Sequence, residues 1–309
     1  MTSGLARSVQ TRLVRHAHAL GVDPNLVLAR YATERLLYRL SRSQYVERFV
    51  LKGALMLLVW LGEAIRPTRD ADLLGLGDLD VDALRTIMLE ICALKVEPDG
   101  LEFDVASLRV APIRIEDAYG GQRATLVARL GSGRLRVQVD IGTGDAVFPE
   151  PEWIDYPSLL DLPRPRIRAY RRETAIAEKL HAMVELGSKN SRMRDFFDIR
   201  ALATAETFEG AVLGRAIATT FARRRTPLPG EIPLALTPAF AAIEGKGAQW
   251  SGFVRRLPRA SVPLDLEAVI SDVAAFAGPV LLAAGRGELF DKTWTPGGPW
   301  SHQRPTETQ

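Results

Sequence analysis

Two aspartates, Asp70 and Asp72, stand one residue apart in the stretch RPTRDADLLG, directly before an apolar pair. We expect this stretch to form a strand, where residues two apart point to the same side, so the two carboxylates would aim together. Side by side in a cleft they would repel each other, and a hard divalent cation with a preference for oxygen ligands would remove that conflict. The pair therefore predicts a site for one or two Mg²⁺ ions.

A third carboxylate would strengthen such a site, and two candidates are open. Asp140 lies in RVQVDIG, near the end of an alternating strand among valines, where an unpaired buried charge would be costly. Asp104, in LEFDVAS, is the weaker rival. The aspartate pair also has a plainer interpretation, as a surface cluster paired with Arg66 or Arg69, because a D-x-D spacing alone is common.

Lys52 and Gly53 follow a short apolar strand and precede the buried helical run ALMLLVWLG. A small residue at a strand-to-helix turn lets a phosphate approach the backbone N–H groups at the start of the helix. The stretch is not a Walker A loop, which needs G-x-x-x-x-G-K-[ST]. By itself it is a weak signal for phosphate binding.

A second charged group occurs later in the chain, on two expected helices. Lys179 lies in ETAIAEKLHAMVEL, at the edge of a buried stripe, from which it could reach into a cleft or run along the core edge into solvent. Asp195 and Asp198 in RMRDFFDIR are three apart, hence on one helix face near Arg194, which alone would indicate an ordinary salt-bridged surface.

Composition limits the class of protein. With 309 residues, 47% of them hydrophobic, the chain can form one large domain or two ordinary ones. The single cysteine, Cys92, lies in an apolar run and is interpreted as core filler in a protein of the reducing cytoplasm. No signal peptide pattern occurs at the start, and the apolar segment VISDVAAFAGPVLLAAG is expected to be a buried helix with a break at Pro279, so no membrane is predicted.

Arginine dominates the cations of this chain, whose net charge is +3 and whose pI is near 9.1. Arginine favours bidentate phosphate contacts, so the clusters fit a phosphate-rich partner such as RNA, although an arginine-biased surface would look the same. The clusters are Arg164, Arg166, Arg168, Arg171 and Arg172, and residues 223–225.

The elements that must position these residues follow from periodicity. Helical spacing covers residues 5–45, with Asp23 and Pro24 as a helix start. A mixed α/β region follows, with period-two strands between residues 101 and 140 and a GSG hairpin turn. Residues 148–165 are proline-rich and are interpreted as a connection between lobes; helices dominate afterwards. We therefore predict an α+β fold, with a sheet domain over residues 1–150, a helical domain over 151–309, and a cleft between them.

The blocks FVLKGALMLLVWLG…RPTRDADLLG and AEKLHAMVELGSKNSRMRDFFDI together resemble the two signatures of the AbiEii/AbiGii toxin family, the MenT-type nucleotidyltransferase toxins. Both blocks are in family order, and they cover residues 50–199. The resemblance implies a polymerase-β-like nucleotidyltransferase core with a mixed sheet and a helical C-terminal lobe.

The resemblance also implies roles for individual residues. Asp70 and Asp72 match the metal-binding pair, Thr68 matches a hydroxyl residue, and Lys179 matches a lysine thought to contact the nucleotide triphosphate. Asp195 matches the aspartate of a later motif, with Asp198 as its companion. The chain departs from the family pattern at Ala54, Arg194 and Leu186, and Arg192 or Lys189 is expected to replace the phosphate contact missing at Leu186.

The function implied is Mg²⁺-dependent transfer of NMP from an NTP to the 3′ end of tRNA, which stops translation, in a toxin restrained by a cognate antitoxin. In this interpretation Lys52, Gly53 and Arg194 help to bind substrate, and Asp140 shares a second ion. Two alternatives stay open: transfer to a protein or small-molecule hydroxyl, and a non-catalytic RNA-binding protein.

Overall fold

The computed structural model describes residues 2–62, 66, 68, 70–113, 121–257 and 265–302. The chain divides into two compact units, and each is described by itself. The first unit comprises residues 1–145, 151–169 and 258–260, and the second comprises residues 146–150, 170–257 and 261–309. The boundary expected after residue 150 differs from this division, because residues 151–169 supply two strands to the sheet of the first unit.

The first unit contains a seven-stranded sheet with the order β3-β4-β5-β2-β1-β7-β6. Strand β2 is parallel to β5 and β1 is parallel to β7, while the other neighbours are antiparallel, so the sheet is mixed as predicted. The strands are β1 (Phe49–Lys52), β2 (Ala71–Gly75), β3 (Leu101–Pro112), β4 (Gly121–Leu130), β5 (Gly133–Thr143), β6 (Glu152–Asp155) and β7 (Arg166–Ala169).

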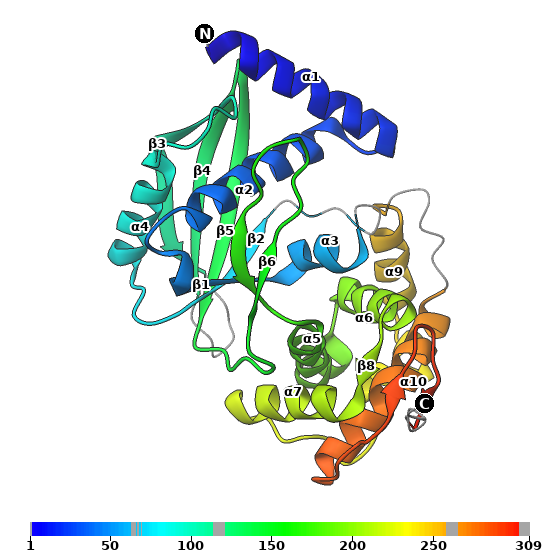
Figure 1. Cartoon of the computed structure of the whole chain (residues 1–309). Coiled ribbons are helices and arrows are strands. Elements are labelled where there is room, and N and C mark those ends of the chain that lie inside the picture. The colour runs from blue at the N-terminus through cyan, green and yellow to red at the C-terminus, as the bar shows by residue number, and fades with distance from the viewer. Residues whose placement is uncertain are drawn as a thin grey trace, which may run out of the picture. The chain divides into compact units, whose positions relative to one another are not determined.

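Helices cover the apolar face of this sheet. Helix α2 packs against β5 and β7, and α4 packs against β3 and β4 (Figure 1). Their apolar side chains join those of the strands in one core, which includes the buried Cys92. The prediction that Cys92 fills the core is confirmed, and burial raises the pKa of its thiol to about 12. The helices are α1 (Thr2–Leu20), α2 (Pro24–Ser41), α3 (Met56–Leu61) and α4 (Val81–Ala93).

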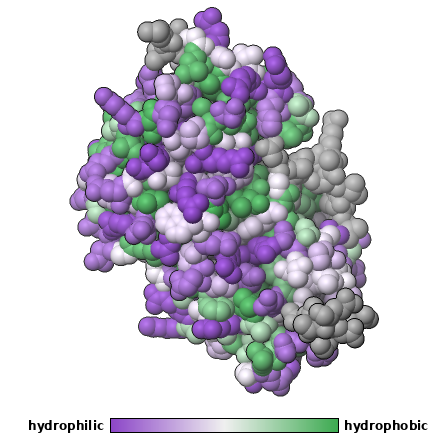
Figure 2. All heavy atoms as spheres, viewed as in Figure 1, coloured by the Kyte–Doolittle hydropathy of each residue, from purple (hydrophilic) through white to green (hydrophobic). Residues whose placement is uncertain are grey.

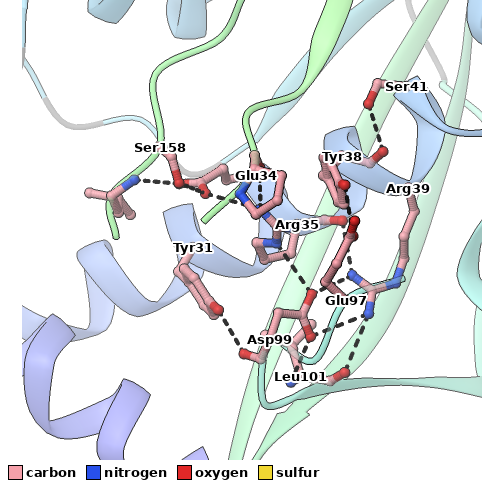
Figure 3. A network of polar contacts seen from close by, with 12 residues as sticks. Tyr31, Glu34, Arg35, Tyr38, Arg39, Ser41, Glu97, Asp99, Leu101 and Ser158 are labelled. Carbon is pink, nitrogen blue, oxygen red and sulfur yellow. Dashed lines mark hydrogen bonds and ion pairs between the residues drawn. The ribbon is translucent and has the colours of Figure 1, made fainter. Parts of the chain in front are cut away.

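Helix α2 starts where the sequence predicts. The Asp23 side chain accepts a hydrogen bond from the Asn25 N–H, and Pro24 occupies the first turn. The helix is buried on all sides from Tyr31 to Leu40. The polar residues among these are held by a network of hydrogen bonds and ion pairs shown in Figure 3.

The proline-rich segment is more than the connection that was expected. It contains the edge strand β6, whose Ile154 pairs with Ile167 of β7. Residues before prolines favour extended backbone, which is compatible with a short strand at a sheet edge.

On the face in view, hydrophilic residues predominate and hydrophobic ones form small patches (Figure 2).

The second unit is mainly helical, with a three-stranded sheet ordered β10-β9-β8. Its helices are α5 (Arg172–Leu186), α6 (Met193–Ala205), α7 (Gly210–Arg223), α8 (Pro238–Ala241), α9 (Lys246–Val254) and α10 (Leu266–Gly285), and its strands are β8 (Phe208–Glu209), β9 (Thr293–Trp294) and β10 (Trp300–Ser301).

Helix α10 is the one described helix with the length and hydropathy to cross a membrane, but half of its most apolar window is buried in the fold. It packs against α6, α7 and α8, as a core helix does. The expected break at Pro279 is wrong, since the helix runs through this residue. Proline removes one backbone hydrogen bond, and the buried neighbours Phe276 and Val280 hold the helix in place on either side.

Candidate functional site

The turn after β1 is shaped around a carboxylate. Gly53 has φ +72°, a conformation that favours glycine, and a Cβ at this position would collide with the side chain of Asp72. The predicted order of strand, glycine turn and helix is confirmed: β1 is followed by a short 3₁₀ turn, Gly53–Leu55, and then by α3. The Asp72 carboxylate lies in the space that the missing side chain leaves open.

Four charged side chains occupy one row across neighbouring strands. Asp72 in β2 is the register partner of Lys52 in β1 on one side and of Asp140 in β5 on the other. Asp140 is in turn the partner of Arg123 in β4. Directly opposed residues point to the same face of a sheet, so the order across it is cation, anion, anion, cation. We call Lys52, Asp72, Asp140 and Arg123 the charged row.

Arg123 binds Asp140 through two parallel hydrogen bonds, Nε to Oδ1 and Nη2 to Oδ2, each 2.7 Å. This bidentate geometry is the strong form of the arginine–carboxylate pair. The hydrogen bond to Asp140, followed by the charges of Asp140, Asp70 and Asp72, raises the pKa of Arg123 above its ordinary value. Three acidic groups therefore lie within electrostatic reach of one guanidinium.

Asp70 lies in the bend immediately before β2 and is exposed. Its carbonyl accepts a long hydrogen bond of 3.5 Å from the Thr68 hydroxyl. Thr68 is thus adjacent to the first aspartate of the pair, as its place in the motif implies. The plainer interpretation of the pair involved Arg66 or Arg69. Arg66 is partly exposed, and Arg69 lies outside the described residues.

The register separates the two candidates for a third carboxylate. Asp140 stands beside Asp72, whereas Asp104 is on the edge strand β3 and pairs with Arg129 at 2.8 Å. The hydrogen bond from Arg129 holds the pKa of Asp104 below its ordinary value. Asp104 is therefore part of an ion pair at the sheet edge, away from the charged row.

Sequence reasoning missed Asp145, which forms a 2.6 Å ion pair with Lys52 Nζ. Both side chains are largely buried, with 15% and 11% of their surface exposed. Asp145 directly follows Gly144, which comes after the end of β5. Its position five residues beyond Asp140 is the feature of the sequence that could have indicated an acid near the same end of the strand. The pair fixes the ammonium of Lys52 at the end of the charged row.

The metal prediction can be tested against the donor groups. Within the described ranges, no group of three or more histidine, cysteine or acidic side chains is gathered so as to hold a metal ion. Asp70 and Asp72 nevertheless offer the oxygen donors that Mg²⁺ prefers, and the Gly53 turn leaves room for one of them. The aspartate pair therefore fits a divalent cation, while the Asp140 oxygens are bound by Arg123.

The second unit holds the other predicted group. Lys179 on α5 places Nζ 2.8 Å from Asp198 Oδ2 and 3.2 Å from Asp195 Oδ1, both on α6. Both acids are almost fully buried, at 0% and 1% exposure, so the surface interpretation of this pair is wrong. Arg192 Nε lies 2.8 Å from the second Asp195 oxygen, Oδ2.

These four residues form a charge-balanced cluster, which we call the lysine cluster: Lys179, Arg192, Asp195 and Asp198. Two buried carboxylates hold a lysine whose side chain keeps 15% of its surface exposed. Arg194 is exposed on the same helix and is not one of the four residues of the cluster. The charged row belongs to the first unit and the lysine cluster to the second.

Two solved structures from Helicobacter pylori are similar in fold. One is a candidate nucleotidyltransferase, with a TM-score of 0.51 and 15% identity, over 86% of this chain and 99% of that one. The other is the protein JHP933, with a TM-score of 0.49 and 15% identity, over 86% and 94% of the two chains. No curated protein matches the sequence.

A sequence model described as nucleotidyl transferase AbiEii toxin, type IV toxin–antitoxin system, matches residues 35–273. This range includes both predicted signatures, the whole charged row and the lysine cluster. It also covers well over half of the chain and reaches into both units. The chain belongs to the AbiEii family of nucleotidyltransferase toxins.

Proposed function

We propose that this toxin, as a MenT-type member, transfers NMP from an NTP to the 3′ end of tRNA in a Mg²⁺-dependent reaction of the EC 2.7.7 class, and so blocks translation in the cytoplasm. The observation that carries the proposal is the position of Asp72 between Lys52 and Asp140, with its carboxylate in the space left by Gly53. In a family of nucleotidyltransferases, the paired carboxylates of this row are the natural place for a divalent cation that would in turn bind the nucleotide phosphates.

In the proposed reaction the acceptor 3′ oxygen bonds to the α-phosphorus, the α–β phosphoanhydride bond breaks, and pyrophosphate leaves. Asp70 and Asp72 would hold Mg²⁺, with Asp140 as the candidate third oxygen donor or as the base that takes the hydroxyl proton. A bound divalent cation offsets charge on the transferring phosphoryl group and on the leaving pyrophosphate. Lys52, the backbone at Gly53 and the hydroxyl of Thr68 would contact the phosphates.

The lysine cluster supplies the second part of the proposal. Asp195 and Asp198 hold the Lys179 ammonium, which would bind the negative triphosphate. Arg192 is the better candidate for a further phosphate contact, since it already contacts Asp195, and exposed Arg194 would bind substrate more peripherally. A cognate antitoxin is the protein partner that the family implies.

The test is to incubate the protein with each labelled NTP, Mg²⁺ and total RNA. Wild type should label RNA in the size range of tRNA, and Asp70→Ala and Lys179→Ala should each lose labelling. Asp104→Ala is a matched control, because it removes a carboxylate of the same sheet outside the charged row.

Each outcome bears on one part of the proposal. Label in protein or in a small molecule would overturn tRNA as the acceptor and leave nucleotidyl transfer standing. Undiminished labelling by Asp70→Ala would refute the chemistry itself. RNA binding that is unaffected by EDTA, with no turnover of any NTP, would favour a non-catalytic RNA-binding protein.

A further inference from the structure

A cavity of about 440 Å³ lies within the first unit, where the end of α2 meets β6 and the loop before β7. Its volume is in the range of small-ligand sites. Among its described lining residues three are arginines, two are aromatic and none is acidic. This cavity, which we call the arginine pocket, is lined by Tyr38, Ser41, Arg42, Val46, Trp153, Pro163, Arg164 and Arg166.

Buried polar side chains of α2 fix the walls of the arginine pocket. Arg35 Nη1 donates a 2.9 Å hydrogen bond to the carbonyl of Pro163, a lining residue. Glu34 accepts hydrogen bonds from the Ser158 hydroxyl (2.7 Å) and the Leu159 N–H (2.8 Å) (Figure 3). Arg35 and Glu34 are 0% and 1% exposed, so the loop is tied to the helix from inside the core. The pocket is therefore formed before any ligand binds.

The exposed groups of the pocket combine an aromatic surface with positive charge. Trp153, on the edge strand β6, is 44% exposed, so its indole is accessible from solvent. Arg42 and Arg164 are exposed as well. Arg166 has an acidic neighbour, Asp155, at 3.6 Å, but both side chains are more than half exposed, and such ion pairs are weak.

We propose that the arginine pocket binds a single-stranded segment of RNA, with one base stacked on Trp153 and the adjoining phosphates bound by the arginines. Stacking on aromatic side chains beside a positively charged groove is how proteins hold single strands without reading their sequence. An acidic peptide would satisfy the arginines but would make no use of the exposed indole. The proposal rests on the proposed function in one respect, namely that RNA is the acceptor.

The experiment measures binding of a fluorescein-labelled 12-nucleotide single-stranded RNA by anisotropy, in EDTA and without NTP. We expect Trp153→Ala to weaken binding about tenfold, the loss of one base stack, and Trp153→Phe to retain most of the affinity. Arg42→Gln and Arg164→Gln should each lower the slope of log K against log salt by about 0.7, the value for one phosphate contact to a single strand.

Three controls make the result decisive. Arg134→Gln removes an exposed arginine of the same unit outside the pocket, and it should leave binding unchanged. A blunt duplex of the same sequence offers no free base, so Trp153→Ala should affect it little. Melting temperatures of all variants, measured by circular dichroism, should match wild type. If Trp153→Ala does not fold, the salt slopes of Arg42→Gln and Arg164→Gln carry the test, and slopes equal to that of wild type overturn the proposal.

The proposal is overturned if Trp153→Ala and Trp153→Phe bind single-stranded RNA as wild type does, or if Arg134→Gln has the same effect as the pocket arginines. Equal dependence of polyglutamate binding on Trp153 would instead assign the pocket to an acidic protein partner. Asp70→Ala should lose nucleotide transfer and keep RNA binding. Failure of the wild-type protein to transfer any nucleotide, while its RNA binding still depends on Trp153, would refute the proposed function alone.

Discussion

At the scale of single residues, Gly53 carries two constraints that can be separated by mutation. Its positive φ disfavours any side chain, and a Cβ would also collide with Asp72. Gly62 has a similar φ of +80° with nothing within 4 Å of the added Cβ, so it experiences the backbone constraint alone. The two glycines therefore form a matched pair.

We predict that Gly53→Ala loses nucleotide transfer and melts at a lower temperature than Gly62→Ala, which should lose only about 1 kcal/mol of stability from backbone strain. The reason is that the Asp72 carboxylate must move out of the charged row to accommodate the methyl group. Differential scanning calorimetry and the labelling assay measure the two effects. Equal melting temperatures with retained activity would show that the Asp72 position is not set by Gly53.

Arg123 allows a second prediction, about the cation site. It is bound to Asp140 through both oxygens and feels the charges of Asp70 and Asp72. Arg123 competes with a cation for these carboxylates, and its attraction to them is worth about 1 kcal/mol or more. Arg123→Gln removes this competing charge. Mn²⁺ should therefore bind several-fold more tightly to the variant in isothermal titration calorimetry.

The same variant should melt at a lower temperature without a divalent cation, since the carboxylates lose their counter-charge, and Mn²⁺ should restore the loss. Arg129→Gln, which removes the partner of Asp104, is the control and should alter neither property. Weaker Mn²⁺ binding by Arg123→Gln would mean that the arginine supports the cation site instead of competing with it.

Spacing along the chain singled out Asp70 and Asp72, and the family resemblance singled out Lys179, Asp195 and Asp198, but neither predicted their partners. Arg123 and Asp145 became visible only through the pairing of β4 with β5 and the position of the turn after β5. Such contacts depend on strand register, which a single sequence leaves open. The burial of the two acids on α6 was missed for a related reason, because an i, i+3 spacing is the same on a surface and in a core.

At the scale of elements, α2 is joined to the sheet by ionic groups as well as by apolar packing. Asp99, 3% exposed, contacts Arg39 Nη1 at 2.7 Å and Arg35 Nε at 3.2 Å. Removing one partner of a buried ion pair leaves the other charge uncompensated, which is more costly than the pair is stabilising. The Asp99 carbonyl also accepts a 2.6 Å hydrogen bond from the Tyr31 hydroxyl.

We predict that Asp99→Asn lowers the free energy of unfolding by about 3–5 kcal/mol, because two buried arginines lose their counter-charge. Urea denaturation followed by tryptophan fluorescence measures the change. Asp104→Asn removes an exposed ion-pair partner of Arg129 and should have little effect. A small effect at Asp99 would indicate that backbone carbonyls alone satisfy the two guanidinium groups.

Glu34 on the same helix predicts a pH dependence. Burial raises the pKa of Glu34 above its ordinary value of 4.5, against the opposing hydrogen bonds from Ser158 and Leu159. The folded protein therefore binds this proton more tightly than the unfolded chain. Its stabilising contribution is complete below the unfolded pKa and is lost as the pH rises through the raised folded-state pKa.

Glu34→Gln should remove this loss, since an amide can donate to the Ser158 hydroxyl and accept from the Leu159 N–H without ionising. The free energy of unfolding of the variant, relative to wild type, should therefore increase as the pH rises from below the unfolded pKa of Glu34 through its raised folded-state pKa. Urea titrations at several pH values test the trend, with exposed Glu47→Gln as the control. A difference that stays constant or falls with pH would contradict the assignment.

Elements with strong local signals could be predicted from the sequence, and those defined by distant pairing could not. Period-two alternation and the GSG turn predicted β4 and β5. Strands β6 and β7 are four residues each and lie among prolines. Strand β7 pairs with β1 from much earlier in the chain, and β6 pairs with β7.

At the scale of the whole molecule, the family match spans residues 35–273 and thus joins the charged row and the lysine cluster in one chain. In the proposed reaction the first unit would supply carboxylates that suit a cation, and the second would supply the lysine held by Asp195 and Asp198. Removing either should therefore stop the reaction, and the two losses should not add, because groups that act in one step behave as a unit.

Mixing two inactive variants tests whether the two groups must come from the same chain. We predict that Asp70→Ala mixed with Lys179→Ala labels no RNA at any protein concentration, since each copy lacks one required group and the family match places both within one chain. A mixture of wild type with either variant should give activity proportional to the wild-type share, which controls for inhibition by the inactive copy. Recovery of labelling that rises with the square of concentration would instead mean that two copies exchange units to complete one site.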